Sequence, residues 1–190
     1  SIMVLLRAFL IFFLLINFSN ANDLLSYEKQ SKISIKELAV NLKKSLKGVL
    51  KESGPIAAVE YCNIAALDIT SDVSNKNNIF IKRTSLKLRN KNNMPDRWEI
   101  DVLNNFEKRK KNGENVMSLS YQAVYKDNNK SFYRYMKAIP TGKVCLTCHG
   151  SNIDPKLASK LSELYPDDNA YNYKLGDIRG AFSVKIPLPN

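Results

Sequence analysis

One short motif in this sequence has the residue types and the spacing for covalent cofactor chemistry. Residues 145–149 read Cys-Leu-Thr-Cys-His, which is the C-x-x-C-H pattern that attaches c-type haem. In that chemistry the thiols of Cys145 and Cys148 add to the haem vinyl groups, and the imidazole of His149 binds the iron. The sequence contains one histidine in total, and it is His149. The motif therefore predicts one covalently attached haem c, with iron as the metal.

A C-x-x-C pair can also serve as a redox dithiol or form a structural disulfide. A redox pair usually opens a helix within a βαβ unit. Here the pair follows Ile139-Pro140-Thr141-Gly142 and is closed by Gly150, a composition that is typical of a loop. The loop context, the adjacent histidine and the export signal described below favour haem attachment over both alternatives.

The second axial ligand of the iron is the next question, because a low-spin haem needs two and the sequence has no second histidine. Cys62, a methionine or a lysine are the candidates. If residues around Cys62 form a helix, positions 58, 59, 65 and 66 share its face, and three of these four residues are alanine. Small side chains would let a flat macrocycle approach a thiolate. A free cysteine is equally often a small buried core residue, so the residues alone leave both roles open.

The N-terminal 21 residues have the pattern of a secretory signal peptide. Arg7 precedes an apolar run over residues 8–18, and Ser19-Asn20-Ala21 offers small residues for cleavage. The run is shorter than the roughly 20 apolar residues that span a bilayer, so we expect cleavage, with an uncleaved membrane anchor as the alternative. The predicted organisation is a signal peptide over 1–21 and a single domain over 22–190. Covalent haem attachment takes place outside the cytoplasm, which agrees with a periplasmic or otherwise exported protein.

The charge balance is strongly basic, with 29 Lys and Arg against 18 Asp and Glu and a net charge of +11. A basic surface would suit an acidic redox or signalling partner, or peripheral contact with an anionic membrane. The alternative is a lysine-rich composition without a partner, since the only tight basic run is residues 108–111. No basic stripe alternates with aromatic residues, so we expect no nucleic-acid binding.

The elements that must position these residues follow from hydrophobic periodicity. Helical spacing predicts an amphipathic helix over 34–51, opened by a capping box of Ser34 and Glu37. Gly54-Pro55 ends this helix and starts a second one over 55–69. Helices followed by antiparallel strands predict an α+β fold. The remaining predicted elements are a polar linker at 75–78, a strand over 79–89, a helix starting at 95–96, a hairpin of strands 117–125 and 132–139, a helix after Asp154-Pro155, and a strand over 182–188.

With these residues together, the chain resembles the bacterial c-type haem domain with a PAS-like fold. That family includes a stand-alone cyanobacterial haem protein and the sensor regions of histidine kinases. The matching stretches are residues 57–66 around the cysteine, 83–90, 93–99, 138–150 and 175–184. The resemblance implies a PAS-like antiparallel sheet with N-terminal helices. It also implies that His149 and Cys62 are the two iron ligands.

The resemblance implies a redox or diatomic-gas sensor module, and the alternative is a periplasmic electron-transfer cytochrome. The two differ in whether reduction changes the ligation of the iron. We expect no enzyme activity, because the single histidine is assigned to iron and none is left for acid–base catalysis.

Two arginines are candidates for holding the haem. Arg83 and Arg89 lie on the strand that the resemblance places in the core of the domain, and a guanidinium matches a carboxylate in shape and charge. We predict that one of them neutralises a haem propionate. The alternative is that both are solvated charges at the edge of a strand.

Overall fold

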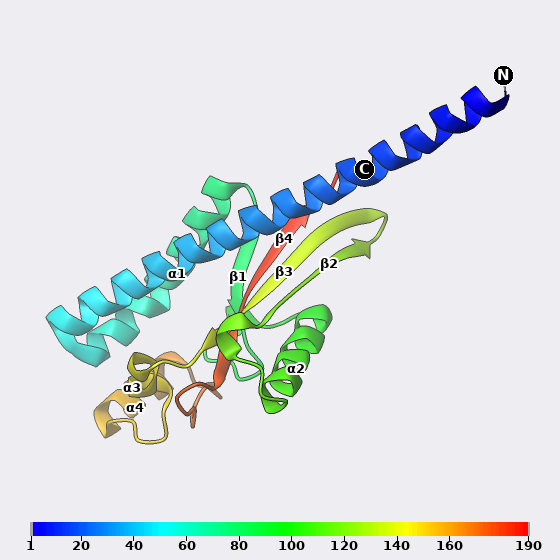
Figure 1. Ribbon diagram of the computed structural model, residues 1–190. Helices are drawn as coiled ribbons and strands as arrows, with labels where there is room; N and C mark the ends of the chain where they lie inside the picture. The colour runs from blue at the N-terminus through cyan, green and yellow to red at the C-terminus, as the bar shows by residue number, and fades with distance from the viewer. Residues whose placement is uncertain (1, 190) are drawn as a thin grey trace.

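The N-terminal half of the protein is a helical hairpin. The computed structural model describes the backbone of residues 2–189 and the side chains of residues 21–189. Helix α1 spans Ile2–Asn77 and is interrupted at Gly54, whose φ of 80° and ψ of −179° are not helical (Figure 1). A residue without a Cβ adopts this conformation without strain, and Pro55 can begin the second arm because its missing N–H is not needed there. The break predicted at Gly54-Pro55 is confirmed.

Both arms of α1 are longer than predicted. The first begins at Ile2, and the second continues through the predicted linker to Asn77. The predicted capping box at Ser34 is wrong, because Ser34 lies inside the helix, fully buried, and donates a hydrogen bond to the Gln30 carbonyl oxygen at 2.9 Å. The arms are joined by an ion pair of 2.6 Å between Lys76 and Glu37.

The predicted signal peptide, residues 1–21, lies outside the described side chains except for Ala21, so it stays a prediction. Within the part of the chain that is described at side-chain level, no helix combines the length and the apolar character that a bilayer crossing requires.

Four antiparallel strands form one sheet in the order β1-β4-β3-β2. Their bounds are Phe80–Thr84 for β1, Ser120–Asp127 for β2, Lys130–Pro140 for β3 and Ile178–Pro187 for β4. The predicted hairpin is confirmed as β2 and β3, which turn at Asn128 and Asn129, both with positive φ as a tight two-residue hairpin requires. Strand β1 ends earlier than predicted, and β4 begins earlier.

Helices cover both faces of the sheet (Figure 1). On one face, α1 packs Leu38 and Val73 against Tyr133 and Val184. On the other face lies α2, Arg97–Lys111, which begins as predicted and is opened by a capping box between Asp96 and Glu99. Its apolar stripe packs against β3 and β4. The α+β class predicted from the order of elements is therefore confirmed.

Short helical elements gather at the end of the sheet where the C-x-x-C-H motif lies (Figure 1). The motif spans a 3-10 turn, Lys143–Cys145, and one helical turn, α3, Leu146–His149. Helix α4, Pro155–Leu164, follows with the predicted Asp154 cap. Two further 3-10 turns, Lys91–Asn93 and Val116–Ser118, connect β1 to α2 and α2 to β2.

A β-bulge interrupts the pairing of β3 and β4 beside this end of the sheet. Ile139 pairs with Gly180 and Pro140 with Ile178, which leaves Arg179 as the extra residue. In a regular strand, residues three apart face opposite sides of the sheet. Ile178 and Ala181 instead pack in the same cluster under α2. The bulge thus turns the Arg179 side chain to the opposite face. It also needs glycine at 180, because a Cβ there would lie 2.2 Å from the Thr84 carbonyl oxygen.

We predict that Gly180→Ala lowers the free energy of unfolding by about 1–3 kcal/mol, because the added methyl group must push β1 away from the bulge. The measurement is urea unfolding of the purified protein. Gly48→Ala is the control, since a Cβ at Gly48 meets nothing within 4 Å and alanine favours the helix by about 1 kcal/mol. Equal stability of the Gly180→Ala and wild-type proteins would contradict the close approach.

Candidate functional site

The C-x-x-C-H residues form a compact turn with both thiols partly exposed. Cys145 and Cys148 are free and lie three residues apart, on the same side of one helical turn. The turn ends at Gly150, where a Cβ would come within 2.6 Å of the Leu146 carbonyl oxygen. The loop expected from the flanking Pro and Gly residues is therefore replaced by a tightly wound segment that fixes the spacing of the two sulfurs.

The imidazole of His149 is held in one defined tautomer. Its Nδ1 lies 2.8 Å from the Ala170 carbonyl oxygen, which can only accept, so Nδ1 carries the proton. Burial, with help from the charges of Arg179 and Arg89, lowers the pKa of His149 to about 2. The ring is thus neutral, and Nε2 presents a lone pair, which accepts a hydrogen bond from Arg179 Nε at 3.3 Å. An oriented neutral imidazole of this kind is what a metal ligand requires.

A buried ion pair holds the backbone that orients His149. Arg89 Nε lies 2.7 Å from an oxygen of Asp168, and the two side chains are 11% and 1% exposed. The other Asp168 oxygen accepts from the Ala170 amide at 2.8 Å. Arg89 also donates to the Cys148 carbonyl oxygen at 2.6 Å. Arg89 therefore has partners within the protein, and the carboxylate-binding role predicted for it from the sequence stays a prediction.

Cys62 lies on the arm of α1 that packs against the C-x-x-C-H turn and α4. Val59 joins the apolar cluster that contains Cys148, and Glu60 forms an ion pair of 3.2 Å with Lys160 of α4. The alanine face predicted around Cys62 is turned inward, since Ala58 is 1% exposed.

The cysteines lie close enough together for Cys62 and Cys145 to influence the pKa of Cys148. Burial raises the pKa of the Cys62 thiol, and the positive charge of Arg83 opposes that rise. Burial likewise raises the pKa of Cys148, and Cys62 and Cys145 are near enough to add to this rise. Cys62, which is about 85 residues away from the motif in sequence, is thus brought to it by the fold.

Comparison with known proteins gives the family. The model of the Tll0287-like family, described as Tll0287, matches residues 19–187. The chain belongs to the Tll0287-like family. The crystal structure of the cyanobacterial heme-protein Tll0287 covers 82% of this chain and 94% of its own, with a TM-score of 0.61 and 21% sequence identity. At this identity the likeness shows a shared fold. No curated protein matches the chain. The family expected from the sequence is therefore confirmed.

In this Tll0287-like chain, sequence reasoning missed Arg179 as a site residue. Arg179 lies on the bulge of β4 and reaches His149, and it also donates to Ser85 Oγ at 3.2 Å. Burial lowers the pKa of both Arg179 and Arg83, and the charge of Arg179 lowers the pKa of Arg83 further. Among residues 21–189, no carboxylate lies within ion-pair distance of either guanidinium. Two neighbouring, partly buried cations without an ion-paired acid attract an anionic group.

Asp168 and Ala170 were also missed, and the sequence holds no signal for them. Asp168 is one of two adjacent aspartates after Pro166, and only the fold shows which of the two is buried. Ala170 acts through its backbone carbonyl, which side-chain patterns do not encode. For Arg179 a signal existed, because it lies beside Gly180 in a stretch that carries the family resemblance.

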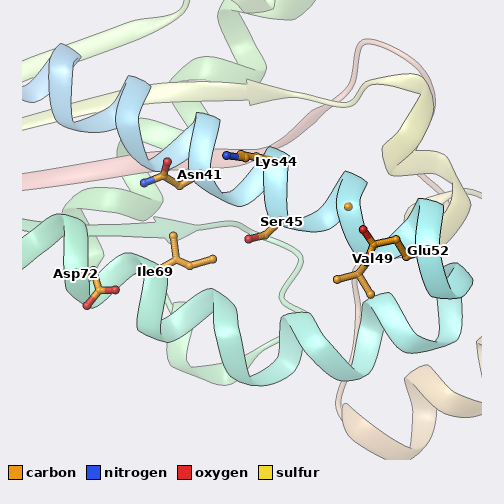
Figure 2. A pocket seen from close by; sticks show the side chains of 8 residues that line it. Asn41, Lys44, Ser45, Val49, Glu52, Ile69 and Asp72 are labelled. Atoms are coloured by element: carbon orange, nitrogen blue, oxygen red, sulfur yellow. The ribbon is translucent and has the colours of Figure 1, made fainter.

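Two hollows lie near the arms of α1 and the candidate site. One, of about 460 Å³, runs between the two arms of α1, and Figure 2 shows its mixed polar and apolar lining. It includes none of the cysteines or His149. The second, of about 300 Å³, is lined by Arg89, Tyr165 and residues beside them, so it borders the candidate site.

We predict that Asp168→Asn lowers the free energy of unfolding by about 3 kcal/mol, because it leaves the buried Arg89 cation without its counter-charge. The neighbouring Asp167→Asn is the matched control. Asp167 pairs with Lys91, both side chains are more than half exposed, and its loss should change stability by less than about 1 kcal/mol. Urea unfolding measures both. Equal effects of the two substitutions would refute the structural importance of Asp168.

Proposed function

We propose that this protein is an exported c-type haem protein. Cys145 and Cys148 would hold the haem covalently, and His149 and Cys62 would bind its iron from opposite sides. The observation that carries the proposal is the state of His149. Its Nδ1–H is fixed by the Ala170 carbonyl oxygen, which leaves on Nε2 a neutral lone pair, held in the structure by Arg179, that could bind iron.

The residues around the motif fit a haem. A haem brings two carboxylates as well as iron, and the site provides two partly buried cations, Arg83 and Arg179, that form no ion pair within residues 21–189. We infer that Arg179 and Arg83 are the partners of the haem propionates. Arg89 would then act by holding Asp168 and the Cys148 carbonyl oxygen. Ala58, Val59 and Ala66, which share the helix face of Cys62, are small or medium-sized side chains on the side of the arm that is turned toward the domain.

We further propose that the protein is a redox or diatomic-gas sensor. Bound haem supplies one-electron chemistry and an iron site for diatomic gases. The contribution of this chain would be Cys62, since it lies on a helical arm that is separate from the covalent anchor. Release or binding of its sulfur would change the packing of α1, which lies against β1, β3 and β4. The alternative, an electron-transfer cytochrome, is favoured by the partial exposure of Cys145 and Cys148, because a haem held by these residues would be accessible to a redox partner.

We predict that protein produced with a c-haem assembly system carries one haem that survives acid extraction, detected by mass spectrometry. Cys145→Ser with Cys148→Ser should lose the adduct, because both thioether bonds are removed. Cys62→Ser is the control and should keep the adduct, since Cys62 makes no covalent bond to the ring. Haem that is extractable from the unmodified protein would contradict covalent attachment.

We predict that the reduced protein binds CO rapidly, because a thiolate donates charge and stabilises ferric over ferrous iron, so that Cys62 is released on reduction. Optical spectra after CO addition measure this. A six-coordinate ferrous haem that ignores CO would reject the gas-sensing proposal and leave the electron carrier.

A further inference from the structure

The outer face of the first arm of α1 carries a strip of lysines and apolar side chains. We call it the lysine strip; its residues are Lys29, Ile33, Lys36, Val40, Lys43 and Lys47. They recur at three-, four- and seven-residue intervals, which places them along one side of a helix. All six are exposed, and Ile33 and Val40 are 53% and 54% exposed.

The position of the strip follows from the buried side of the same arm. Ile35 and Leu38 pack into the core against the sheet, at 7% and 0% exposure. Helical periodicity puts Lys36, Val40 and Lys43 on the side opposite Leu38, so the strip faces away from the domain. From Lys29 to Lys47 it is about 27 Å long, at the rise of an α-helix.

The charge of the strip is not neutralised within the protein. Two acids of this arm lie beside it, and each is already occupied: Glu28 pairs with Lys32 at 2.5 Å, and Glu37 pairs with Lys76 at 2.6 Å. Among residues 21–189, none of the four strip lysines forms an ion pair. The strip therefore presents four free positive charges with two large apolar side chains between them.

We propose that the lysine strip docks the protein on an anionic lipid surface. Lysines would bind the headgroups, and Ile33 and Val40 would enter the interface, which is the pattern of helices that lie on membranes. An acidic protein would match the charge but gives no reason for exposed Ile33 and Val40. The proposal does not depend on haem.

The test is co-sedimentation of purified, haem-loaded protein with lipid vesicles, using variants that share one N-terminus as checked by mass spectrometry. One vesicle set is phosphatidylcholine alone, and the other is an equal mixture with phosphatidylglycerol. The strip variant is Lys36→Gln, Lys43→Gln and Lys47→Gln. The control variant is Lys126→Gln, Lys130→Gln and Lys156→Gln, three exposed lysines elsewhere. Both variants lose the same net charge, and glutamine keeps the helix propensity of lysine.

The wild type should prefer the anionic vesicles by roughly tenfold or more, and the strip variant should lose roughly tenfold of that binding while the control keeps most of it. High salt should weaken the preference. Ile33→Ser with Val40→Ser should lower the binding that remains at high salt. Equal losses in the strip and control variants would overturn the proposal, because net charge alone would explain them. A wild type without preference for anionic vesicles would also overturn it and point to an acidic protein. Covalent haem content, read from absorbance, is unchanged in either case.

Discussion

The candidate site depends on the buried ion pair between Arg89 and Asp168. This pair joins three segments that are distant in sequence: the chain after β1, the loop after α4 and the C-x-x-C-H turn. Through the Ala170 amide and carbonyl it also sets the orientation of His149. Because a buried charge without its partner costs several kcal/mol, the pair either forms or the loop rearranges. The position of His149 Nε2, the nitrogen that we propose as an iron ligand, is thus determined by residues that would not themselves touch a metal.

A second constraint is the bulge of β4, which works from the opposite side of His149. Gly180 permits β1 to approach, and the extra residue turns Arg179 toward the imidazole and toward Arg83. The result is a pair of partly buried guanidiniums that repel each other, and among residues 21–189 neither forms an ion pair with a carboxylate. Such an arrangement is costly by itself and becomes favourable when an anionic group binds. Two independent parts of the fold therefore act at the site: the ion pair orients His149, and the bulge places the positive charge that would attract an anion.

Much of this could be predicted from the sequence where the signal is local. The Gly54-Pro55 break, the Asp154 cap and the hairpin at Asn128 each follow from the chemistry of a few adjacent residues, and all are confirmed. The capping box at Ser34 failed because Ser34 is fully buried in the interior of the first arm of α1, so tertiary packing overrides a local signal.

Within the site, the thiols and His149 are readable from their spacing, and the match to the family could be expected from the same residues. The roles of Asp168, Ala170 and Arg179 could not be predicted from the sequence, because they arise from contacts between distant segments and from a one-residue bulge. Hydrophobic periodicity predicts which face of a helix or strand a residue lies on, but it does not predict which distant loop a buried arginine such as Arg89 will contact. Cys62 is intermediate: its helix and its alanine face were predictable, and its approach to Cys148 required the fold.

The central claim is the proposal that Cys62 and His149 would both bind the haem iron. The most direct measurement is electron paramagnetic resonance of the oxidised, haem-loaded protein, comparing the wild type with Cys62→Ser and with Asn63→Ser as the neighbouring control. The account predicts a low-spin ferric signal in the wild type and the control, and a high-spin signal in Cys62→Ser, because serine is a poor ligand for ferric iron. An unchanged low-spin spectrum in Cys62→Ser would contradict the assignment of Cys62.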